Sequence, residues 1–426
     1  MSGDSKQQIE AAIGKLYKQE SSRILAVLTR VFGPQNFALA EDVLQDAFAK
    51  ALLNWQQQGL PANPLAWLIS SAKNQAIDVI RHNKTKLKFA DDLSYHLHSE
   101  WSLGNTLEQE FSQPKIKDDQ LRMIFACCDM DIKAQNRIPF ILKTLCGLSL
   151  EAISRALLQP VQVIKKRLYR TRKQLQQQSF NFPEPEQLTG LMHKVHTVLY
   201  LLFNEGFHSS EKQQPINLMF CQEAIGLAKL LIDEPSVVNQ DTLGLLALMY
   251  FQIARVSSRV DQQGFNVPID LQDRSLWDQL HFKSARQLLQ LAPTNVNGGA
   301  GRFFLGALIA KEHCAASCFA DTHWRQIVEV YEHLIQITRS PVAGLNQAIA
   351  IAYAGDVSLG IAKVKDLQGH PALKKSHMPL AILAHLDAKS GNAELAYKQA
   401  EASIALGGTA HEHRLLMQQI QRQLAG

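Results

Sequence analysis

Apolar residues recur every three to four positions along most of the chain, which predicts a protein built from α-helices. No alternation of apolar and polar residues is long enough to build a sheet. The pattern predicts early helices at residues 7–32, 38–55, 64–85, 117–128, 131–146, 149–158 and 161–176. It breaks between residues 89 and 113, where five acids occur without one Lys or Arg. This segment is expected to be an extended, acidic linker.

The second half of the chain is also a succession of predicted helices. It follows a boundary marked by Pro183 and Pro185. Two of its segments, LNQAIAIAYAGD and LAILAHLDAKSGN, end in small residues and a glycine, and these glycines, Gly355 and Gly391, are 36 residues apart. The spacing is close to the roughly 34-residue helical hairpin of tetratricopeptide repeats (TPRs). The sequence therefore predicts a helical, TPR-like domain over residues 187–426.

Polar side chains gather on the outer face of the predicted helix 38–55. Placing Leu44 on the buried face leaves Asp42, Gln45 and Asp46 pointing outward together. An acidic and amide cluster on a basic module is a candidate site for docking another protein. The alternative is an ordinary solvated helix face.

The predicted helix 64–85 begins after Asn63, a favourable N-cap residue. Trp67, Asn74 and Arg81 are seven residues apart and therefore line up along one side of it. A ring that stacks on bases, an amide that recognises a base edge and a guanidinium for phosphate suit binding of a single nucleic-acid strand. The alternative is that Trp67 belongs to the hydrophobic core.

The segment EAISRALLQPVQVIKKRLYRTRKQL (151–175) carries six Lys and Arg and no acid after Gln159. The apolar stripe of its second helix is Ile164, Leu168, Thr171 and Leu175. The opposite face carries Lys165, Lys166, Tyr169, Arg170 and Lys173. With Ser149 as an N-cap and Pro160 in the turn, two short amphipathic helices predict a DNA-binding helix-turn-helix. A merely solvated helix would usually mix acids with its cations.

The charge is unevenly distributed along the 426 residues, whose formal net charge is +5. Residues 1–180 contain 24 Lys and Arg against 17 Asp and Glu, whereas the remainder contains 20 against 22. A basic first half favours a module that binds a polyanion. The N-terminus lacks an apolar signal core, and the apolar run from Leu243 is too short to cross a bilayer. We therefore expect a cytoplasmic protein without a membrane segment.

Little in the sequence favours metal binding or catalysis. Four of the six cysteines lie in apolar helical patterns and are expected to be buried: Cys127, Cys128, Cys146 and Cys221. The segment HCAASCFADTH (313–323) lacks the spacing of a zinc site. NVNGGAGRFF (295–304) lacks the lysine of a phosphate-binding loop, and Glu205 has no partnered base or nucleophile in the pattern. No metal, cofactor or enzymatic activity is expected.

Together these segments resemble the extracytoplasmic-function class of bacterial RNA polymerase sigma factors. The matching strings, in order over residues 20–176, are AEDVLQDAF, NPLAWL, AKNQAIDVIR and GLSLEAISRALLQPVQVIKKRLYRTR. Further strings resemble the TPR-like extension of one subgroup: VLYLLFNEGF, QDRSLWD, DTHW and SPVAGLNQAIA. The resemblance implies an all-α fold with sigma region two at 1–88, the linker at 89–113, a region-four helix-turn-helix at 114–180 and a regulatory extension at 187–426.

The resemblance implies that the protein directs core RNA polymerase to promoter DNA and starts transcription. It places Asp42, Gln45 and Asp46 on the clamp helices of the polymerase β′ subunit, and region four on the β flap. The minus-ten element would be bound by Trp67, Lys73, Asn74 and Arg81, with Lys73 standing where the family commonly has Arg. The minus-thirty-five element would be bound by Lys165, Lys166, Tyr169 and Arg170. A regulatory protein or ligand is expected on the C-terminal domain.

Two features depart from the family pattern. ACCDMD (126–131) stands where the subgroup often has Cys-Cys-His-Pro, and Pro139 is expected to interrupt or kink its helix. The alternative function is a one-component helix-turn-helix regulator with a helical sensor domain, working without core polymerase. That alternative leaves the outward cluster around Gln45 and the side chains aligned with Trp67 without a role.

Overall fold

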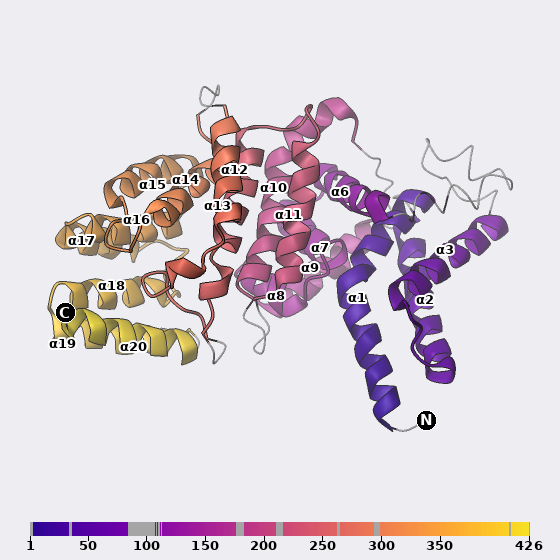
Figure 1. Cartoon of the computed structure of the whole chain (residues 1–426), viewed down its shortest axis with the longest axis horizontal. Helices are drawn as coiled ribbons and strands as arrows, with labels where there is room; N and C mark the ends of the chain where they lie inside the picture. The colour runs from indigo at the N-terminus through magenta and orange to yellow at the C-terminus, as the bar shows by residue number, and fades with distance from the viewer. Residues whose placement is uncertain are drawn as a thin grey trace. The chain divides into compact units, whose positions relative to one another are not determined.

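The chain is helical in both of the compact units that make up its structure (Figure 1). The computed structural model describes residues 3–33, 36–83, 107, 109, 111, 113–175, 183–209, 216–261, 265–293, 299–408 and 410–425. The units are Met1–Val238 and Asn239–Gly426. Across the described residues the only β-structure is an isolated antiparallel bridge between Val260 and Asn266, so the predicted all-α fold is confirmed. No helix in these ranges is long and apolar enough to span a membrane.

The first unit contains every helix predicted before residue 180. Its helices are α1 (Gly3–Phe32), α2 (Phe37–Gln58), α3 (Pro64–Asn83), α6 (Gln113–Asp129), α7 (Ala134–Thr144), α8 (Leu150–Ala156), α9 (Val161–Leu175), α10 (Pro185–Phe207) and α11 (Leu218–Ile232). Most of the predicted acidic linker 89–113 lies outside the described residues. The compact units divide only after Val238, so α10 and α11 belong with α6 and α7, and the predicted domain boundaries stay predictions.

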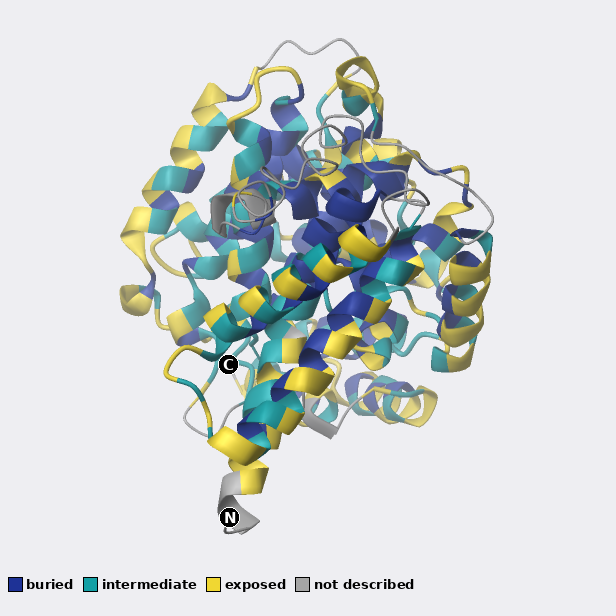
Figure 2. Cartoon of the chain, turned by 90° about the vertical axis from the view of Figure 1, so that its right-hand side faces the viewer, coloured by how far each residue is buried: buried dark blue, intermediate teal, exposed yellow. Residues whose placement is uncertain are grey.

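Helices α1, α2 and α3 pack around a shared apolar core. Phe32, Trp55 and Leu68 are almost completely buried there. The Tyr17 ring meets the Phe48 ring edge-on at 5.0 Å, which adds a contact between α1 and α2. Asn63 caps α3 as predicted, because its Oδ1 accepts a hydrogen bond of 3.0 Å from the Ala66 amide. Figure 2 shows buried positions where helices meet and exposed positions on their outer faces.

Helix α1 is also tied to the helices that follow residue 112. Arg30 Nε lies 3.1 Å from Asp119 Oδ1 on α6, and their side chains are only 4% and 0% exposed. Near the middle of α1, Arg23 pairs with Glu223 on α11 and with Glu20 on its own helix. Two ion pairs therefore fix α1 against α6 and α11.

Helix α7 continues through Pro139, so the expected interruption does not occur. Proline has no N–H, and Pro139 therefore leaves the carbonyl of Gln135, four residues earlier, without its helical donor. Arg167 of α9 donates to that carbonyl through Nη1 at 3.2 Å. A side chain from a neighbouring helix thus supplies the hydrogen bond that the proline cannot make.

Four buried cysteines belong to the core of this unit. Cys127, Cys128, Cys146 and Cys221 are all free thiols and buried, as predicted. Burial raises the pKa of the Cys128 thiol to about 12, and it raises the pKa values of Cys127 and Cys146 as well. These thiols are protonated at neutral pH and pack as small apolar groups.

The second unit consists of helices packed in neighbouring pairs. They are α12 (Gln240–Ile253), the 3-10 helices η2 (Val256–Ser258) and η3 (Arg274–Leu276), α13 (Gln279–Leu291), α14 (Arg302–Ala315), α15 (Trp324–Thr338), α16 (Pro341–Tyr353), α17 (Val357–Leu367), α18 (Met378–Lys389), α19 (Ala393–Leu406) and α20 (Ala410–Ala425). The turns after α16 and α18 contain Gly355 and Gly391, with φ values of +116° and +82°. Glycine adopts such angles without a steric penalty, so both residues occupy the turns that their spacing predicts.

Glycine is required where α12 approaches α14. A Cβ atom on Gly244 would lie 2.4 Å from Phe304 Cα, whereas one on Gly306 would meet only Leu248 Cδ2 at 3.4 Å. We expect Gly244→Ala to lower the free energy of unfolding of this unit by at least about 2 kcal/mol, because two helix backbones must move apart. Gly306→Ala, the matched control in α14, should be neutral or stabilising by up to about 1 kcal/mol. Denaturant unfolding of the two variants measures the difference, and equal stabilities would contradict this packing.

Candidate nucleic-acid interface

Three polar side chains form an exposed cluster on α2. Asp42, Gln45 and Asp46 are all exposed, whereas Leu44 and Phe48 of the same helix are buried. The predicted outward orientation of the cluster is confirmed. Its role in binding core polymerase stays a prediction.

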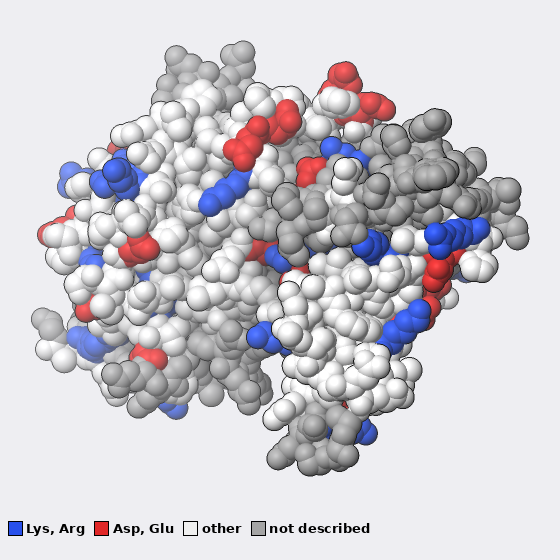
Figure 3. All heavy atoms as spheres, turned by 45° about the vertical axis from the view of Figure 1, so that its right-hand side comes forward, with Lys and Arg blue, Asp and Glu red and all other residues white. Residues whose placement is uncertain are grey.

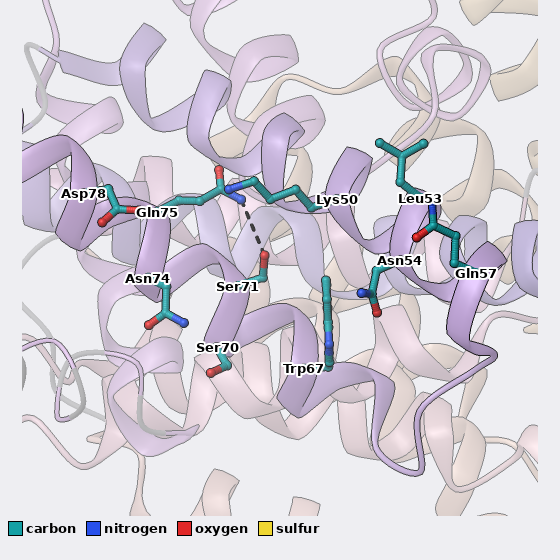
Figure 4. A pocket seen from close by; sticks show the side chains of 10 residues that line it. All are labelled: Lys50, Leu53, Asn54, Gln57, Trp67, Ser70, Ser71, Asn74, Gln75 and Asp78. Atoms are coloured by element: carbon teal, nitrogen blue, oxygen red, sulfur yellow. Dashed lines mark hydrogen bonds between the residues drawn. The ribbon is translucent and has the colours of Figure 1, made fainter.

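A hollow of about 520 Å³ lies between α2 and α3 (Figure 4). Its lining residues are Lys50, Leu53, Asn54 and Gln57 of α2 and Trp67, Ser70, Ser71, Asn74, Gln75 and Asp78 of α3. Most of these carry amide or hydroxyl groups, which donate and accept hydrogen bonds without a fixed charge. The volume falls within the range of small-ligand sites. The hollow combines an aromatic surface with polar groups that can pair with an organic base.

The position of Trp67 fits both roles considered from the sequence, a residue of the hydrophobic core and a surface on which a base can stack. Its ring is half-buried and meets the ring of Trp55 edge-on, with centroids 5.5 Å apart and an interplanar angle of 70°. The core therefore holds one side of the ring, while the same side chain also lines the hollow. A ring fixed in this way loses little further freedom when a base stacks on it.

The four residues predicted for the minus-ten element are not all brought together. Trp67 and Asn74 line the hollow, but Lys73 is half-buried beside it and Arg81 is exposed towards the end of α3. The sequence prediction missed the contribution of α2. Lys50, Asn54 and Gln57 are four and three residues apart and so share one helical face, which was the available signal.

Helices α8 and α9 are joined by a tight turn closed by side chains. Ser149 Oγ accepts a hydrogen bond of 3.1 Å from the Ala152 amide, so the predicted N-cap is confirmed. Ser154 Oγ donates to the carbonyl of Gln159 at 2.5 Å. Leu158 has a φ of +51° and is 84% exposed, and Pro160 lies one residue before α9. These contacts set the direction in which α9 leaves the turn.

The two faces of α9 are those that the sequence predicts. The buried residues of the helix are Ile164, Leu168, Thr171 and Leu175. The predicted DNA-contacting residues are all exposed: Lys165, Lys166, Tyr169 and Arg170. The Tyr169 side chain is 70% exposed, which is uncommon for an aromatic residue with only an internal role. The apolar stripe anchors the helix and leaves a basic, aromatic face available.

Two other cations of α9 are used inside the protein. Arg167 donates to Gln135 of α7, and Arg172 Nη2 lies 2.8 Å from Glu41 Oε1 on α2. Burial raises the pKa of Glu41, and the charge and hydrogen bond of Arg172 oppose that shift. Glu41 precedes Asp42, so the ion pair places α9 next to the exposed cluster of α2.

The charged side chains on the surface drawn in Figure 3 are mixed in sign. Lys and Arg in blue lie among Asp and Glu in red over the described residues of that face. The described residues of that face form no continuous basic patch.

The N-terminal helices match a known protein family. Residues 16–85 match the family described as Sigma-70 region 2, and this segment runs from α1 to the end of α3. Residues 191–293 match a family of unknown function, DUF6596. The first match supports a role as a sigma factor in transcription initiation, which implies interaction with core RNA polymerase and promoter DNA.

Most of the chain aligns with a relative. The uncharacterized protein R00370 of Rhizobium meliloti (strain 1021) is 30% identical to it over 347 residues, which cover 80% of this chain and 80% of that protein. The chain belongs to the same family as this protein.

Alanine variants of two arginines of α9 should distinguish a residue that stabilises the fold from one that is only exposed. Arg167→Ala removes the donor to Gln135 and should lower the free energy of unfolding of the first unit by about 1 kcal/mol. Arg170→Ala, the matched control on the exposed face, should change stability by less than about 0.5 kcal/mol. Urea unfolding monitored by circular dichroism tests the pair. Equal effects would mean that Arg167 does not compensate for Pro139.

Proposed function

We propose that this protein is a sigma factor of the extracytoplasmic-function class, which directs RNA polymerase to promoters and initiates transcription. The single observation that carries the proposal is the hollow between α2 and α3, because it lies within the segment that matches Sigma-70 region 2. It offers a core-supported tryptophan and several amides to an unpaired base. The C-terminal domain, interpreted as TPR-like, would regulate this activity.

Each surface has a distinct part in the proposed mechanism. The cluster Asp42, Gln45 and Asp46 binds the clamp helices of core polymerase, and the exposed face of α9 binds the minus-thirty-five element as duplex. The hollow then holds a base of the minus-ten element after the strands part. Unstacking that base costs a few kcal/mol, which stacking and hydrogen bonds inside the hollow offset. The protein stabilises an opened strand and carries out no covalent chemistry.

Asn74 offers a sharp test of strand capture, because it is exposed and lines the hollow without a core contact. We expect Asn74→Ala to reduce promoter opening about tenfold through loss of a base contact, while binding to duplex DNA is unchanged. Permanganate footprinting and run-off transcription with core polymerase measure opening, using promoters selected from a random library. Gln58→Ala, exposed at the end of α2 and outside the hollow, is the control.

Three outcomes of this experiment would reject the proposal or part of it. If the protein binds duplex DNA but never joins core polymerase, the one-component regulator is the better interpretation. Association without synthesis on any promoter would reject the sigma-factor role. Equal activity of Asn74→Ala and Gln58→Ala would show that the hollow has no part in promoter opening.

The contact between α2 and α9 has a consequence for the proposed mechanism. The two promoter elements are roughly 25 base pairs apart, which is about 85 Å of duplex at 3.4 Å per base pair. Modules joined by an ion pair of 2.8 Å between Arg172 and Glu41 cannot occupy both elements at once. On this proposal, the contact of α1 with α6 through Arg30 and Asp119 opens as well, and α9 moves away from α2 when the protein engages polymerase and promoter.

A covalent link between the two helices should therefore block initiation. We expect Glu41→Cys with Arg172→Cys, joined by a short bis-maleimide in a Cys318→Ser background, to bind core polymerase through α2 but to lose at least about 90% of run-off product. Each single-cysteine variant treated with the same reagent is a control and should retain activity. Full activity of the linked protein would show that the modules need not separate.

A further inference from the structure

Three basic side chains of the second unit converge from separate elements. Arg255 follows the end of α12, Arg274 begins η3, and His313 lies in the last turn of α14. All three are partly buried. They act on one another electrostatically, because both arginine charges lower the pKa of His313.

Trp277 forms a platform beneath the two guanidinium groups. Its ring is 4% exposed, and its centroid lies 4.6 Å from Arg274 Cζ and 6.0 Å from Arg255 Cζ. The indole is itself held in place, because its Nε1 donates to Ser258 Oγ at 2.7 Å. The ring thus makes a cation–π contact with each guanidinium group, the closer one with Arg274.

The hydrogen-bonding capacity of this cluster is only partly used. Arg274 Nη1 donates to the carbonyls of His313 and Ala316 at 2.8 and 2.6 Å, but its Nη2 is buried without a partner. His313 Nδ1 is likewise buried without a partner. The Arg255 guanidinium makes no hydrogen bond or ion pair with any residue that the structure describes.

The acids of the surrounding segments form their hydrogen bonds and ion pairs outside the cluster, although the charge of Glu312 acts on His313 and that of Asp321 acts on Arg274. Glu312 pairs with His323 at 2.9 Å and with Lys311 at 3.3 Å. Asp273 caps η3 through Ser275, and Asp321 accepts from Ser317. Over the described ranges no group of three or more His, Cys, Asp and Glu is placed to hold a metal ion, so a cation would find no ligand set here.

The pKa shifts of His313 and Arg255 also indicate an excess of positive charge in this cluster. Burial, followed by the charges of Arg255 and Arg274, lowers the pKa of His313 to about 4, so its ring is neutral at pH 7. Burial is also the largest cause of the lowered pKa of Arg255, and no carboxylate is among its electrostatic neighbours. A partly buried guanidinium group without a counter-charge, as at Arg255, is costly, and a bound anion removes that cost.

We propose that Arg255, Arg274 and His313 form a binding site for the phosphate group of a small molecule. Donors arriving from three elements suit an anion with several oxygens in a tetrahedral arrangement better than a carboxylate with two. Arg255 and Arg274 donate to the phosphate oxygens, and His313 gains a proton and becomes a third donor. The two arginines and Trp277 lie within residues 191–293, so the site would give a ligand to the family of unknown function that matches there.

The proposal is tested on the full-length protein with inorganic phosphate as the probe. Titration calorimetry should detect saturable binding at constant ionic strength, and Arg255→Gln should weaken it at least tenfold. Arg286→Gln, exposed on α13, is the matched control and should bind phosphate as the unaltered protein does. Phosphate also stabilises proteins non-specifically, and the Arg255→Gln variant measures that background.

Thermal unfolding separates a binding role for Arg255 from a structural one. Without phosphate, Arg255→Gln should unfold at the same temperature as the unaltered protein or higher, because it removes a partly buried charge that makes no hydrogen bond. A variant that unfolds at a lower temperature would indicate a structural arginine and contradict the proposal. Nuclear magnetic resonance of the unaltered protein provides a second measurement, since bound phosphate should raise the pKa of His313.

The choice of anion decides the class of ligand. Acetate at the same ionic strength should bind at least tenfold more weakly than phosphate. A phosphomonoester such as glycerol phosphate that binds more tightly than inorganic phosphate would identify a phosphorylated molecule as the ligand, whereas equal binding would identify phosphate itself. Equal binding of acetate and phosphate, absence of saturable binding, or equal loss in Arg286→Gln would overturn the proposal.

Discussion

The ion pair between Arg30 and Asp119 is the interaction on which the arrangement of the first unit depends. It joins α1, which carries the packing surface for α2 and α3, to α6, which packs against α10 and α11. Both side chains are almost fully buried, so removing one partner alone would cost about 3–5 kcal/mol, because the charge that stays is kept away from water. A pair of apolar residues could give the same stability, but apolar residues can pack against one another in many different registers. The ion pair instead specifies which position on α1 meets which position on α6.

The local features of this fold could be predicted from the sequence because they depend on neighbours along the chain. The apolar stripe of α9, the N-caps Asn63 and Ser149 and the exposure of the α2 cluster follow from helical periodicity and capping chemistry. Contacts between distant residues could not be predicted. Arg172 meets Glu41, 131 residues earlier, and nothing in the basic run distinguishes it from Arg170. Pro139 appeared to break a helix only because its replacement donor, Arg167, comes from another helix.

The second unit combines a regular scaffold with one irregular region. Helix pairs and the turns at Gly355 and Gly391 repeat along its later part, whereas Arg255, Arg274 and Trp277 lie in the non-repeating segments between α12 and α13. Ring contacts connect the two parts: His313 meets Trp324, Trp324 stacks on Tyr353, and Tyr353 Oη lies 2.9 Å from His385 Nε2. A group bound beside His313 would therefore lie at one end of a row of packed rings.

The ion pair between α2 and α9 is more open to solvent than the pair between α1 and α6. Arg172 keeps 50% of its side chain exposed and Glu41 keeps 20%, so dissolved ions screen their attraction far more than that of Arg30 and Asp119. Under the proposed function, the same ions would also compete with the basic face of α9 for DNA phosphates. On that proposal, a higher ionic strength would act on α9 in two opposing ways: it would weaken the ion pair that holds the helix against α2, and it would weaken the binding of the helix to DNA.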